Sequence, residues 1–246
     1  MKIADTTILV TGANRGLGKA LVEEALRRGA RRVYAGTRQP FAHADRRVMP
    51  LILDVTDASQ IKAAVEKIGA LDILINNAGI SLQNDLSDRV ALERLLAVNL
   101  FGTYDVTQAF LPSLSRSRSA VVNVLSLAAL AAVPFDSLYS ISKAAAFSLS
   151  QSLRALLAAR AVSVHIVFPG PIDTDMTRNL EIPKASAEST ARAILDGVEN
   201  DEEEIFPDPM SVQMAEGWRS SAVKALQRQF AAYVQDTPVK SAASKK

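Results

Sequence analysis

Short apolar runs alternate along the chain with longer segments of helical period. The runs are rich in β-branched residues and are predicted to be strands at residues 7–10, 32–35, 48–53, 71–75, 120–125 and 162–168. The segments between them carry an apolar stripe and are predicted to be helices at residues 17–28, 58–68, 88–111, 138–159 and 187–199. Strands without a polar face are typical of a parallel sheet that helices cover on both sides. The pattern therefore predicts an α/β fold with a doubly wound parallel sheet.

The C-terminal part leaves this alternation. An acidic run at residues 201–204 is predicted to be a solvated loop or strand edge. A helical segment is predicted over residues 209–234, and its expected anchors are Trp218, Val223, Leu226 and Phe230. The polar residues 236–246 are predicted to form a disordered tail. We expect a single domain over residues 1–235, with the substrate region at about 174–235.

Composition excludes several classes of protein. The 246 residues carry a formal net charge of +2, too small to indicate binding of nucleic acid or of an anionic membrane. The absence of cysteine excludes disulfides, thiolate metal sites and thiol nucleophiles. No cluster of His, Asp and Glu has the spacing of a metal site, so no metal is expected. The longest apolar run, residues 127–135, is too short to span a membrane, and a soluble, cytoplasmic protein is expected.

Three glycines directly after the first predicted strand form a candidate phosphate cradle. Gly12 permits a tight turn, Gly16 allows the backbone to approach a pyrophosphate, and Gly18 allows the helix to pack closely on the strand. The helix then begins, so its free N–H groups and positive dipole end face the turn. The alternative is a turn that merely uses glycine. The strand before the turn and the amphipathic helix after it favour a dinucleotide site.

The glycine spacing resembles that of a known family. The run from Thr11 to Gly18 is similar to the Thr-Gly-x-x-x-Gly-x-Gly motif of short-chain dehydrogenases/reductases. The resemblance continues in chain order through Asn76-Asn77-Ala78-Gly79, Asn99, Ser126, Tyr139-Ser140-Ile141-Ser142-Lys143 and Pro169-Gly170. It covers residues 6 to about 180 and implies a Rossmann fold and a nicotinamide cofactor.

Tyr139 and Lys143 are the candidate acid/base pair. They stand four residues apart on a predicted helix and therefore share one face. Ser126 follows a strand, at the carboxyl edge where parallel sheets bind ligands. A free tyrosine has a pKa of about 10, and a nearby ammonium, together with the positive charge of the oxidised nicotinamide, is expected to lower it by two or three units, which corresponds to roughly 3–4 kcal/mol. Ser126 is expected to orient the oxygen of a carbonyl substrate.

The resemblance implies further roles. Lys143 would also hold the nicotinamide ribose, and Asn99 would position a water that relays protons to it, although a buried structural amide is an alternative for Asn99. The cofactor-binding residues would be Gly12, Asn14, Arg15, Gly16, Leu17, Gly18, Thr37, Arg38, Asp54, Val55, Asn77, Ala78, Gly79, Tyr139, Lys143, Pro169, Gly170, Ile172 and Thr174. Of these, the backbone near Ile172 and the hydroxyl of Thr174 would hold the carboxamide, and a simple Pro/Gly turn is the alternative.

NADPH is predicted rather than NADH. Dinucleotide folds that prefer NAD place an acidic residue about 20 positions beyond the glycine run, where it binds the ribose 2′-hydroxyl. Here that place holds Thr37 and Arg38, and the nearest acid, Asp45, lies out in the following loop. Arg15 in the glycine turn can reach the same 2′-phosphate, and a guanidinium suits it by donating two hydrogen bonds at once.

The predicted substrate is a neutral, apolar ketone or aldehyde, or the corresponding alcohol. The residues expected to border the nicotinamide carry no charge: Leu127, Pro134, Phe135, Leu138 and Met176. A homodimer or homotetramer is expected through the two long helices. One alternative is a non-catalytic NADP(H)-sensing regulator, which would have no use for the intact serine, tyrosine and lysine. The other is a dehalogenase on the same fold, which Lys143 and the glycine turn oppose.

Overall fold

The computed structural model describes residues 1–82, 86–114 and 119–236. Its strands are β1 (Thr7–Thr11), β2 (Arg32–Thr37), β3 (Val48–Ile52), β4 (Ile73–Asn76), β5 (Ser119–Val124), β6 (Val162–Val167) and β7 (Glu204–Ile205). Its α-helices are α1 (Gly16–Arg27), α2 (Ala58–Ile68), α3 (Arg89–Leu96), α4 (Thr103–Leu114), α5 (Ser137–Leu157), α6 (Ala187–Glu199), α7 (Pro209–Arg219) and α8 (Ala222–Asp236). A π-helical segment, Ala97–Gly102, joins α3 to α4.

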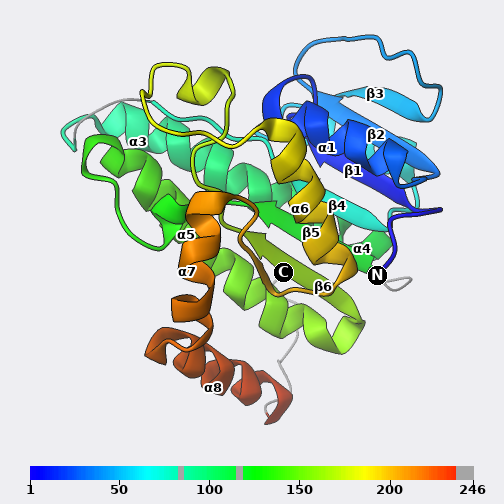
Figure 1. Ribbon diagram of the computed structural model, residues 1–246. Helices are drawn as coiled ribbons and strands as arrows, with labels where there is room; N and C mark the ends of the chain where they lie inside the picture. The colour runs from blue at the N-terminus through cyan, green and yellow to red at the C-terminus, as the bar shows by residue number, and fades with distance from the viewer. Residues whose placement is uncertain (83–85, 115–118, 237–246) are drawn as a thin grey trace, which may run out of the picture.

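The strands form one parallel sheet in the order β3-β2-β1-β4-β5-β6-β7 (Figure 1). The strand order reverses between β1 and β4, because the chain first adds strands on one side of β1 and then on the other. In open α/β sheets a ligand binds at the carboxyl ends of the strands beside this reversal. The topology therefore indicates a site above the ends of β1, β4 and β5.

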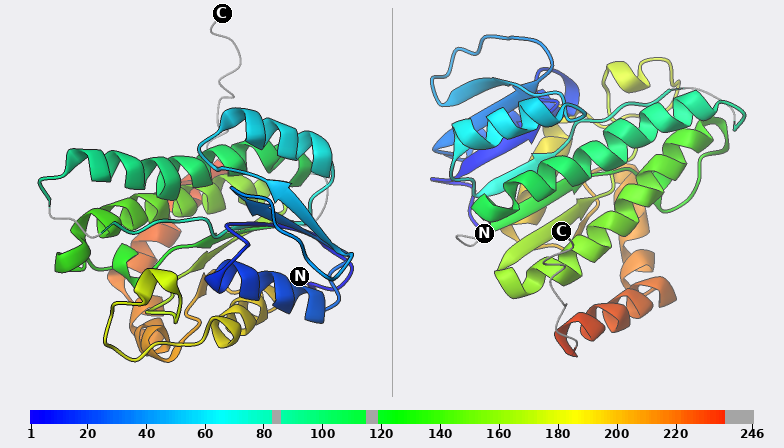
Figure 2. Two further views of the ribbon diagram at one scale, coloured as in Figure 1. Left: turned by 90° about the horizontal axis from the view of Figure 1, so that it is seen from above. Right: turned by 180° about the vertical axis from the view of Figure 1, so that it is seen from behind.

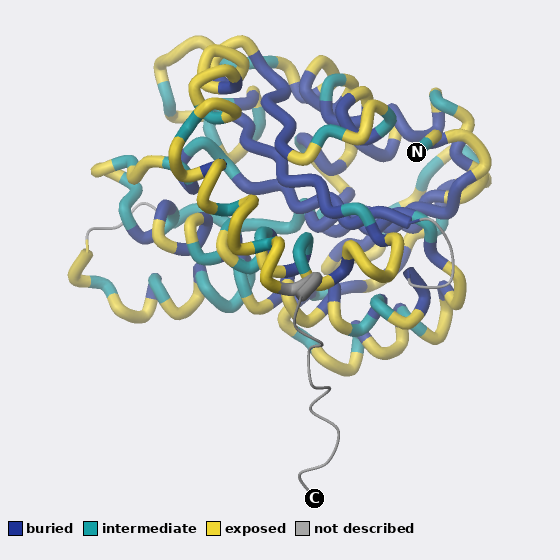
Figure 3. Tube along the Cα trace, turned by 90° about the horizontal axis from the view of Figure 1, so that it is seen from below, coloured by how far each residue is buried: buried dark blue, intermediate teal, exposed yellow. Residues whose placement is uncertain are grey.

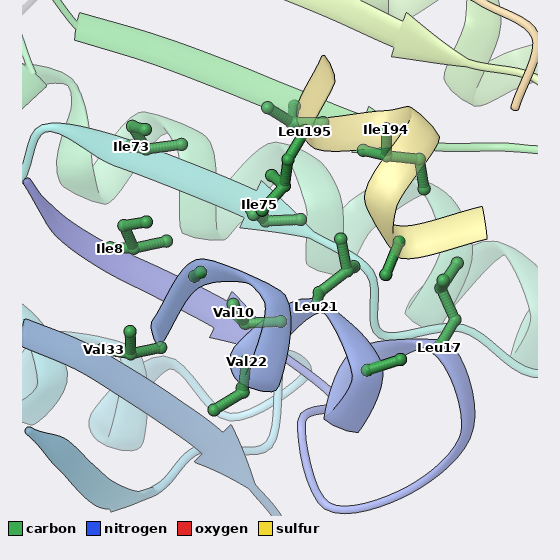
Figure 4. Close-up of a cluster of buried hydrophobic side chains, with 14 of the residues drawn as sticks. Ile8, Val10, Leu17, Leu21, Val22, Val33, Ile73, Ile75, Ile194 and Leu195 are labelled. Atoms are coloured by element: carbon green, nitrogen blue, oxygen red, sulfur yellow. The ribbon is translucent and has the colours of Figure 1, made fainter. Parts of the chain in front are cut away.

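Helices cover both faces of the sheet. Figure 2 shows α1 and α6 on one side and α2, α4 and α5 on the other. Successive residues of β1 serve the two cores: Ile8 and Val10 pack with α1 and α6, as Figure 4 shows, whereas Leu9 packs with α2, α4 and α5. The strands in the middle of the sheet are accordingly buried along their length (Figure 3). This burial on both faces explains why the strands contain no alternating polar residues.

The fold confirms the predicted doubly wound parallel sheet in a single domain. All of the predicted strands form, and the helices predicted at residues 58–68 and 187–199 are α2 and α6. The helix predicted at residues 88–111 forms as α3 and α4 with the π-helical segment between them. Residues 237–246 of the predicted tail lie outside the described residues.

The prediction for the C-terminal segment is wrong in two respects. Residues 209–234 form two helices, α7 and α8, because the chain turns at Ser220 and Ser221 and a new helix begins. Of the predicted anchors only Trp218 packs inward, with ring centroids 5.6 Å from Phe147 and 6.2 Å from Phe168. The other three anchors are exposed on α8: Val223 (58%), Leu226 (46%) and Phe230 (57%).

A buried ion cluster attaches α8 instead. The Lys224 side chain is only 2% exposed, and its Nζ donates to Glu203 and to both carboxylate oxygens of Glu204 at 2.6 to 2.8 Å. Arg154 on α5 also pairs with Glu204, at 2.5 Å. The acidic run is therefore not simply solvated, since Glu204 is 6% exposed in β7. Because Lys224 binds these two glutamates, the charged side of α8 faces the protein. The apolar stripe of the helix therefore faces solvent.

Candidate active site

The glycine turn after β1 has the shape of a phosphate cradle. Gly12 and Gly16 adopt positive φ angles of +66° and +50°, which favour glycine. A Cβ on Gly18 would lie 2.1 Å from the Gly12 carbonyl oxygen, so only glycine fits there. Helix α1 begins at Gly16 and presents its N-terminal N–H groups to the turn, with no acidic residue in its first turn. The turn therefore fits the pyrophosphate of a dinucleotide.

Thr11 at the end of β1 and Asn77 directly after β4 hold the turn in place. The Thr11 hydroxyl accepts hydrogen bonds from the backbone N–H groups of Asn77 and Ala78, both at 3.0 Å. The Asn77 amide donates to the backbone carbonyls of Thr11 and Gly12. Asn77 thus stabilises the backbone of the glycine turn, and the motif alone did not predict this role.

The remaining predicted contacts of the adenosine half surround the same end of the sheet. Thr37 is buried, and its hydroxyl donates to the Gln39 carbonyl, while Arg38 beside it is exposed. Asp54 accepts from the backbone and hydroxyl of Thr56. The other members of this group are Asn14, exposed in the turn, Leu17, buried in the core of α1 and α6, and Val55, buried.

Ser126, Tyr139 and Lys143 come together above the end of β5. A hydrogen bond links the side chains of Ser126 and Tyr139. The Lys143 ammonium lies 5.6 Å from the centroid of the Tyr139 ring and donates to the Val124 carbonyl at 3.0 Å. Because both residues lie on α5, one helical turn apart, the helix sets their spacing. The predicted shared face is therefore present, with Lys143 almost fully buried at 5% exposure.

The ammonium of Lys143 alone does not lower the pKa of Tyr139. Burial raises this pKa to about 12; the hydrogen bond with Ser126 lowers it, and the charge of Asp136 raises it. Burial also lowers the pKa of Lys143 to about 8. Loss of water around both groups outweighs the attraction that the ammonium was expected to supply. In this state the tyrosine holds its proton at neutral pH.

Asn99 lies in the π-helical segment, beside the lysine. Its side-chain carbonyl accepts from Ile80 N, and its amide donates to Ile80 O and to Ser142 Oγ, each at 2.9 Å. A Cβ on Gly79 would lie 3.3 Å from Asn99 Oδ1 and 3.6 Å from Lys143 Nζ, so a larger residue at this position would crowd the asparagine. The side chain is thus buried and fully bonded, as the structural alternative required.

The Pro169-Gly170 loop follows β6 and folds against α7. The Gly170 N–H donates to Asp208 Oδ2 at 2.7 Å, and the Pro169 carbonyl accepts from Leu127 N at 3.0 Å. Ile172 is buried and pairs with Ala185 in an isolated parallel bridge, and this bridge closes the loop between them. Thr174 lies over the glycine turn, with its Cγ2 3.1 Å from the position of a Cβ on Gly16.

The predicted substrate residues divide into core and rim. Leu138 is 2% exposed and packs between α3 and α5, so it is not on a pocket surface. Leu127 packs against the core cluster that contains Phe168 and Phe206. Phe135 (69%) and Met176 (51%) are exposed, and Pro134 is exposed beside Phe135.

Two acidic residues were missed by the sequence analysis. Asp208 caps α7 and holds Gly170, and no local motif distinguishes it from other N-cap aspartates. Asp136 accepts a 2.8 Å hydrogen bond from Ser81 and lies one turn before Tyr139. Its position three residues before the tyrosine was the available signal, because residues at that spacing share a helix face.

Two features are absent from the part of the chain that the structure describes. Within it, no three His, Asp or Glu side chains gather in a group that could hold a metal ion. None of its helices is both long enough and apolar enough to cross a membrane.

Comparisons with known proteins agree with this geometry. The family model described as short chain dehydrogenase matches residues 6–185. A short-chain dehydrogenase from Burkholderia cenocepacia, solved in complex with NADP, is 37% identical with a TM-score of 0.85, covering 93% of this chain and 98% of that chain. The 3-oxoacyl-(acyl-carrier-protein) reductase of Haemophilus influenzae is 35% identical over 185 residues, 70% of this chain and 76% of that protein. The NADPH-bound carbonyl reductase from chicken fatty liver is 26% identical with a TM-score of 0.74, covering 81% of this chain and 93% of that chain.

The chain therefore belongs to the short-chain dehydrogenase/reductase family. It is an oxidoreductase of the group that acts on CH–OH groups.

Proposed function

We propose that this protein is an NADPH-dependent reductase of a neutral, apolar ketone or aldehyde, or a dehydrogenase of the corresponding alcohol. The observation that carries the proposal is the hydrogen-bonded Ser126–Tyr139 pair, with the Lys143 ammonium beside it, at the strand ends next to the glycine turn. Tyr139 would be the acid, Ser126 the orienting hydroxyl and Lys143 the cation. All three would border the place where a nicotinamide supplies or accepts the hydride.

Tyr139 would give the proton that carbonyl reduction requires. A pKa of about 12 keeps its phenol protonated at neutral pH, ready to donate to the alkoxide that develops on the substrate. The Ser126 hydroxyl would hold the substrate oxygen at the same time, because its interaction with Tyr139 places both hydroxyls in one site. In the reverse direction the phenolate would accept the proton from an alcohol.

Lys143 would stabilise the phenolate that remains after this transfer. With a pKa of about 8, its ammonium is mostly protonated at pH 7, and a buried positive charge attracts a phenolate strongly where water is scarce.

An apolar substrate fits the exposed residues at the rim. Phe135 and Met176 offer uncharged surface near the loop, and no basic side chain is among the predicted pocket residues. Similar proteins include a carbonyl reductase and a 3-oxoacyl-(acyl-carrier-protein) reductase, and both names specify a carbonyl substrate. Neutral ketones should therefore exceed small carboxylates in kcat/KM, and the opposite order would refute this substrate class.

The choice of NADPH rests on the end of β2. Arg38 is exposed there, directly after the buried Thr37, and no acidic residue stands in that stretch. Solved relatives were obtained with NADP or NADPH bound. A hydrogen bond to a charged group contributes about 1.5–3 kcal/mol, so Arg38 should give roughly a 10- to 100-fold preference. Arg38→Ala should reduce kcat/KM for NADPH much more than for NADH, and an unchanged ratio would contradict this assignment.

The decisive experiment for the reaction is Tyr139→Phe, with the exposed Tyr104→Phe as its matched control. The variant loses one hydroxyl, so it should fold and bind NADPH while its turnover with ketones falls at least about 100-fold. Normal turnover in the folded Tyr139 variant would refute the proposed role. A wild type that binds NADPH but oxidises it with no ketone of a broad panel would favour the NADP(H)-sensing regulator.

A homodimer through α4 and α5 is part of the proposal. The exposed apolar residues on and beside these helices are Phe101 (54%), Tyr104 (44%), Ile141 (43%) and Leu156 (45%). The two helices lie side by side in Figure 2 and can present these residues to a second copy. Light scattering should give more than the 26.4 kDa of one chain, and Tyr104→Glu should shift the protein toward the monomer. A wild-type monomer at micromolar concentration would refute this interface.

A further inference from the structure

Asp175 stands as an anion between two arginines at the mouth of the candidate cofactor site. Its Oδ2 accepts a hydrogen bond from Arg15 at 3.1 Å, and its Oδ1 accepts one from Arg178. Arg15 lies at the N-terminal end of α1, where its side chain makes no capping bond. The ion pair therefore connects the glycine turn to the loop that follows Thr174.

The loop is packed closely enough to keep Asp175 near Arg15. The position of a Cβ on Gly16 lies 3.1 Å from Thr174 Cγ2, so the loop already touches the turn. A cavity of about 330 Å³ opens beside this contact. It is lined by Gly16, Asp173, Thr174, Asp175, Arg178 and Lys184. A ligand phosphate that reaches Arg15 must therefore come close to Asp175.

The two arginines predicted to hold a 2′-phosphate are in different states. Arg38 is exposed, and among the described residues no carboxylate pairs with it. Arg15 already donates to a carboxylate. A carboxylate and a phosphate both accept hydrogen bonds from the guanidinium fork, so they compete for the same donors. A ligand that lacks the 2′-phosphate does not compete with Asp175 for the hydrogen bonds of Arg15.

We propose that Asp175 is a specificity-determining residue that competes with the 2′-phosphate of the cofactor for Arg15. The inference rests on the proposed preference for NADPH. When Arg15 turns to the phosphate, Asp175 keeps its bond with Arg178, so the exchange leaves no carboxylate unpaired. Asp175 thus weakens binding of 2′-phosphorylated ligands and has little effect on ligands without that group.

The effect is modest because the pair is exposed. The side chains of Arg15 and Asp175 are 66% and 48% exposed, and ion pairs of this kind contribute little in water. Asp175→Asn should therefore tighten the binding of a 2′-phosphorylated ligand about two- to fivefold. The substitution also removes the negative charge of Asp175 near the phosphate, and this loss of repulsion likewise increases the affinity.

Titration calorimetry with two adenosine ligands tests the proposal on the full chain. Adenosine 2′,5′-bisphosphate and adenosine 5′-monophosphate differ only in the 2′-phosphate. Asp175→Asn should tighten the bisphosphate alone. The matched control is Asp173→Asn, which removes the same charge from the same cavity without contacting Arg15. Equal tightening of both ligands, or an equal effect of the control, would overturn the inference.

The Arg15→Ala background completes the cycle. There Asp175→Asn should no longer favour the bisphosphate, because the donor for which the two anions compete is absent. A benefit that persists in this background would refute the proposal. If the wild type does not prefer the bisphosphate, the proposed NADPH preference fails as well. If the wild type prefers it through Arg15 while Asp175→Asn changes nothing, only this inference fails.

Discussion

Lys224→Met would test the buried ion cluster that attaches α8. Methionine keeps much of the apolar stem and removes the ammonium, whose Nζ donates to Glu203 at 2.6 Å and to both oxygens of Glu204 at 2.8 Å. The Lys224 side chain is 2% exposed and that of Glu204 is 5% exposed, so water cannot readily replace the lost bonds.

The structure places the expected loss near the lower end of the usual range. Removing one partner of a buried ion pair costs about 3–5 kcal/mol, because the other charge stays buried. Here Glu204 keeps Arg154 at 2.5 Å, and the Glu203 side chain is 55% exposed and can turn toward water. We therefore expect a loss of about 3 kcal/mol in the free energy of unfolding of the C-terminal segment.

Trp218 makes this loss measurable. It is the single tryptophan of the chain and packs against Phe147 and Phe168, so its fluorescence reports on the attachment of α7. In urea the midpoint of the fluorescence transition of Lys224→Met should fall by about 1–3 M, since urea m-values are about 1–3 kcal/mol/M.

The exposed Arg228 on the same helix provides the control. Arg228→Met should shift the transition little, because surface substitutions usually change stability by less than about 0.5 kcal/mol. The reasoning fails if Lys224→Met shifts the transition no further than the Arg228→Met control does.

Three further changes test the site. Gly18→Ala should abolish binding of NADPH by calorimetry, because its Cβ would lie 2.1 Å from a backbone oxygen of the turn, whereas Gly217→Ala, with open space around it, should bind normally. Tight binding by the first variant would contradict the cradle. The kcat/KM for NADPH in ketone reduction should fall as the pH rises through about 8, where Lys143 loses its proton, and a flat profile to pH 10 would contradict this role. Asn99→Ala should lower stability by about 2 kcal/mol in thermal unfolding, because it leaves both backbone groups of Ile80 unpaired; an unchanged Tm would refute this.

The sheet was predictable from the sequence because its determinants are local. Strands such as Ile73–Asn76 are short, apolar and buried on both faces, and amphipathic helices separate them. The glycine turn was predictable for the same reason, since its conformation depends on a few adjacent residues. The meeting of Ser126 with Tyr139 followed from topology, because parallel strands end at one edge.

What failed depends on contacts that are distant in sequence. Lys224 is buried because Glu203 and Glu204, at the start of β7, bind its ammonium. The apolar stripe of α8 predicted instead that Val223, Leu226 and Phe230 would face the core. The pKa of Tyr139 likewise depends on how completely the folded protein removes water from it. Periodicity describes one element at a time and does not contain such partners.

The π-helical segment at Ala97–Gly102 bears on how this chain tolerates change in length. A π turn contains one residue more than the α turn it replaces, so it takes up an insertion without rotating the helix that follows. Asn99 can therefore turn toward Ile80 while Val106 and Phe110 on α4 still face the core. Deletion of one residue from this segment should restore regular α-helical geometry and keep the apolar residues of α4 facing the core. The same deletion should turn Asn99 away from Lys143. We expect the shorter chain to fold, but without Asn99 beside Lys143.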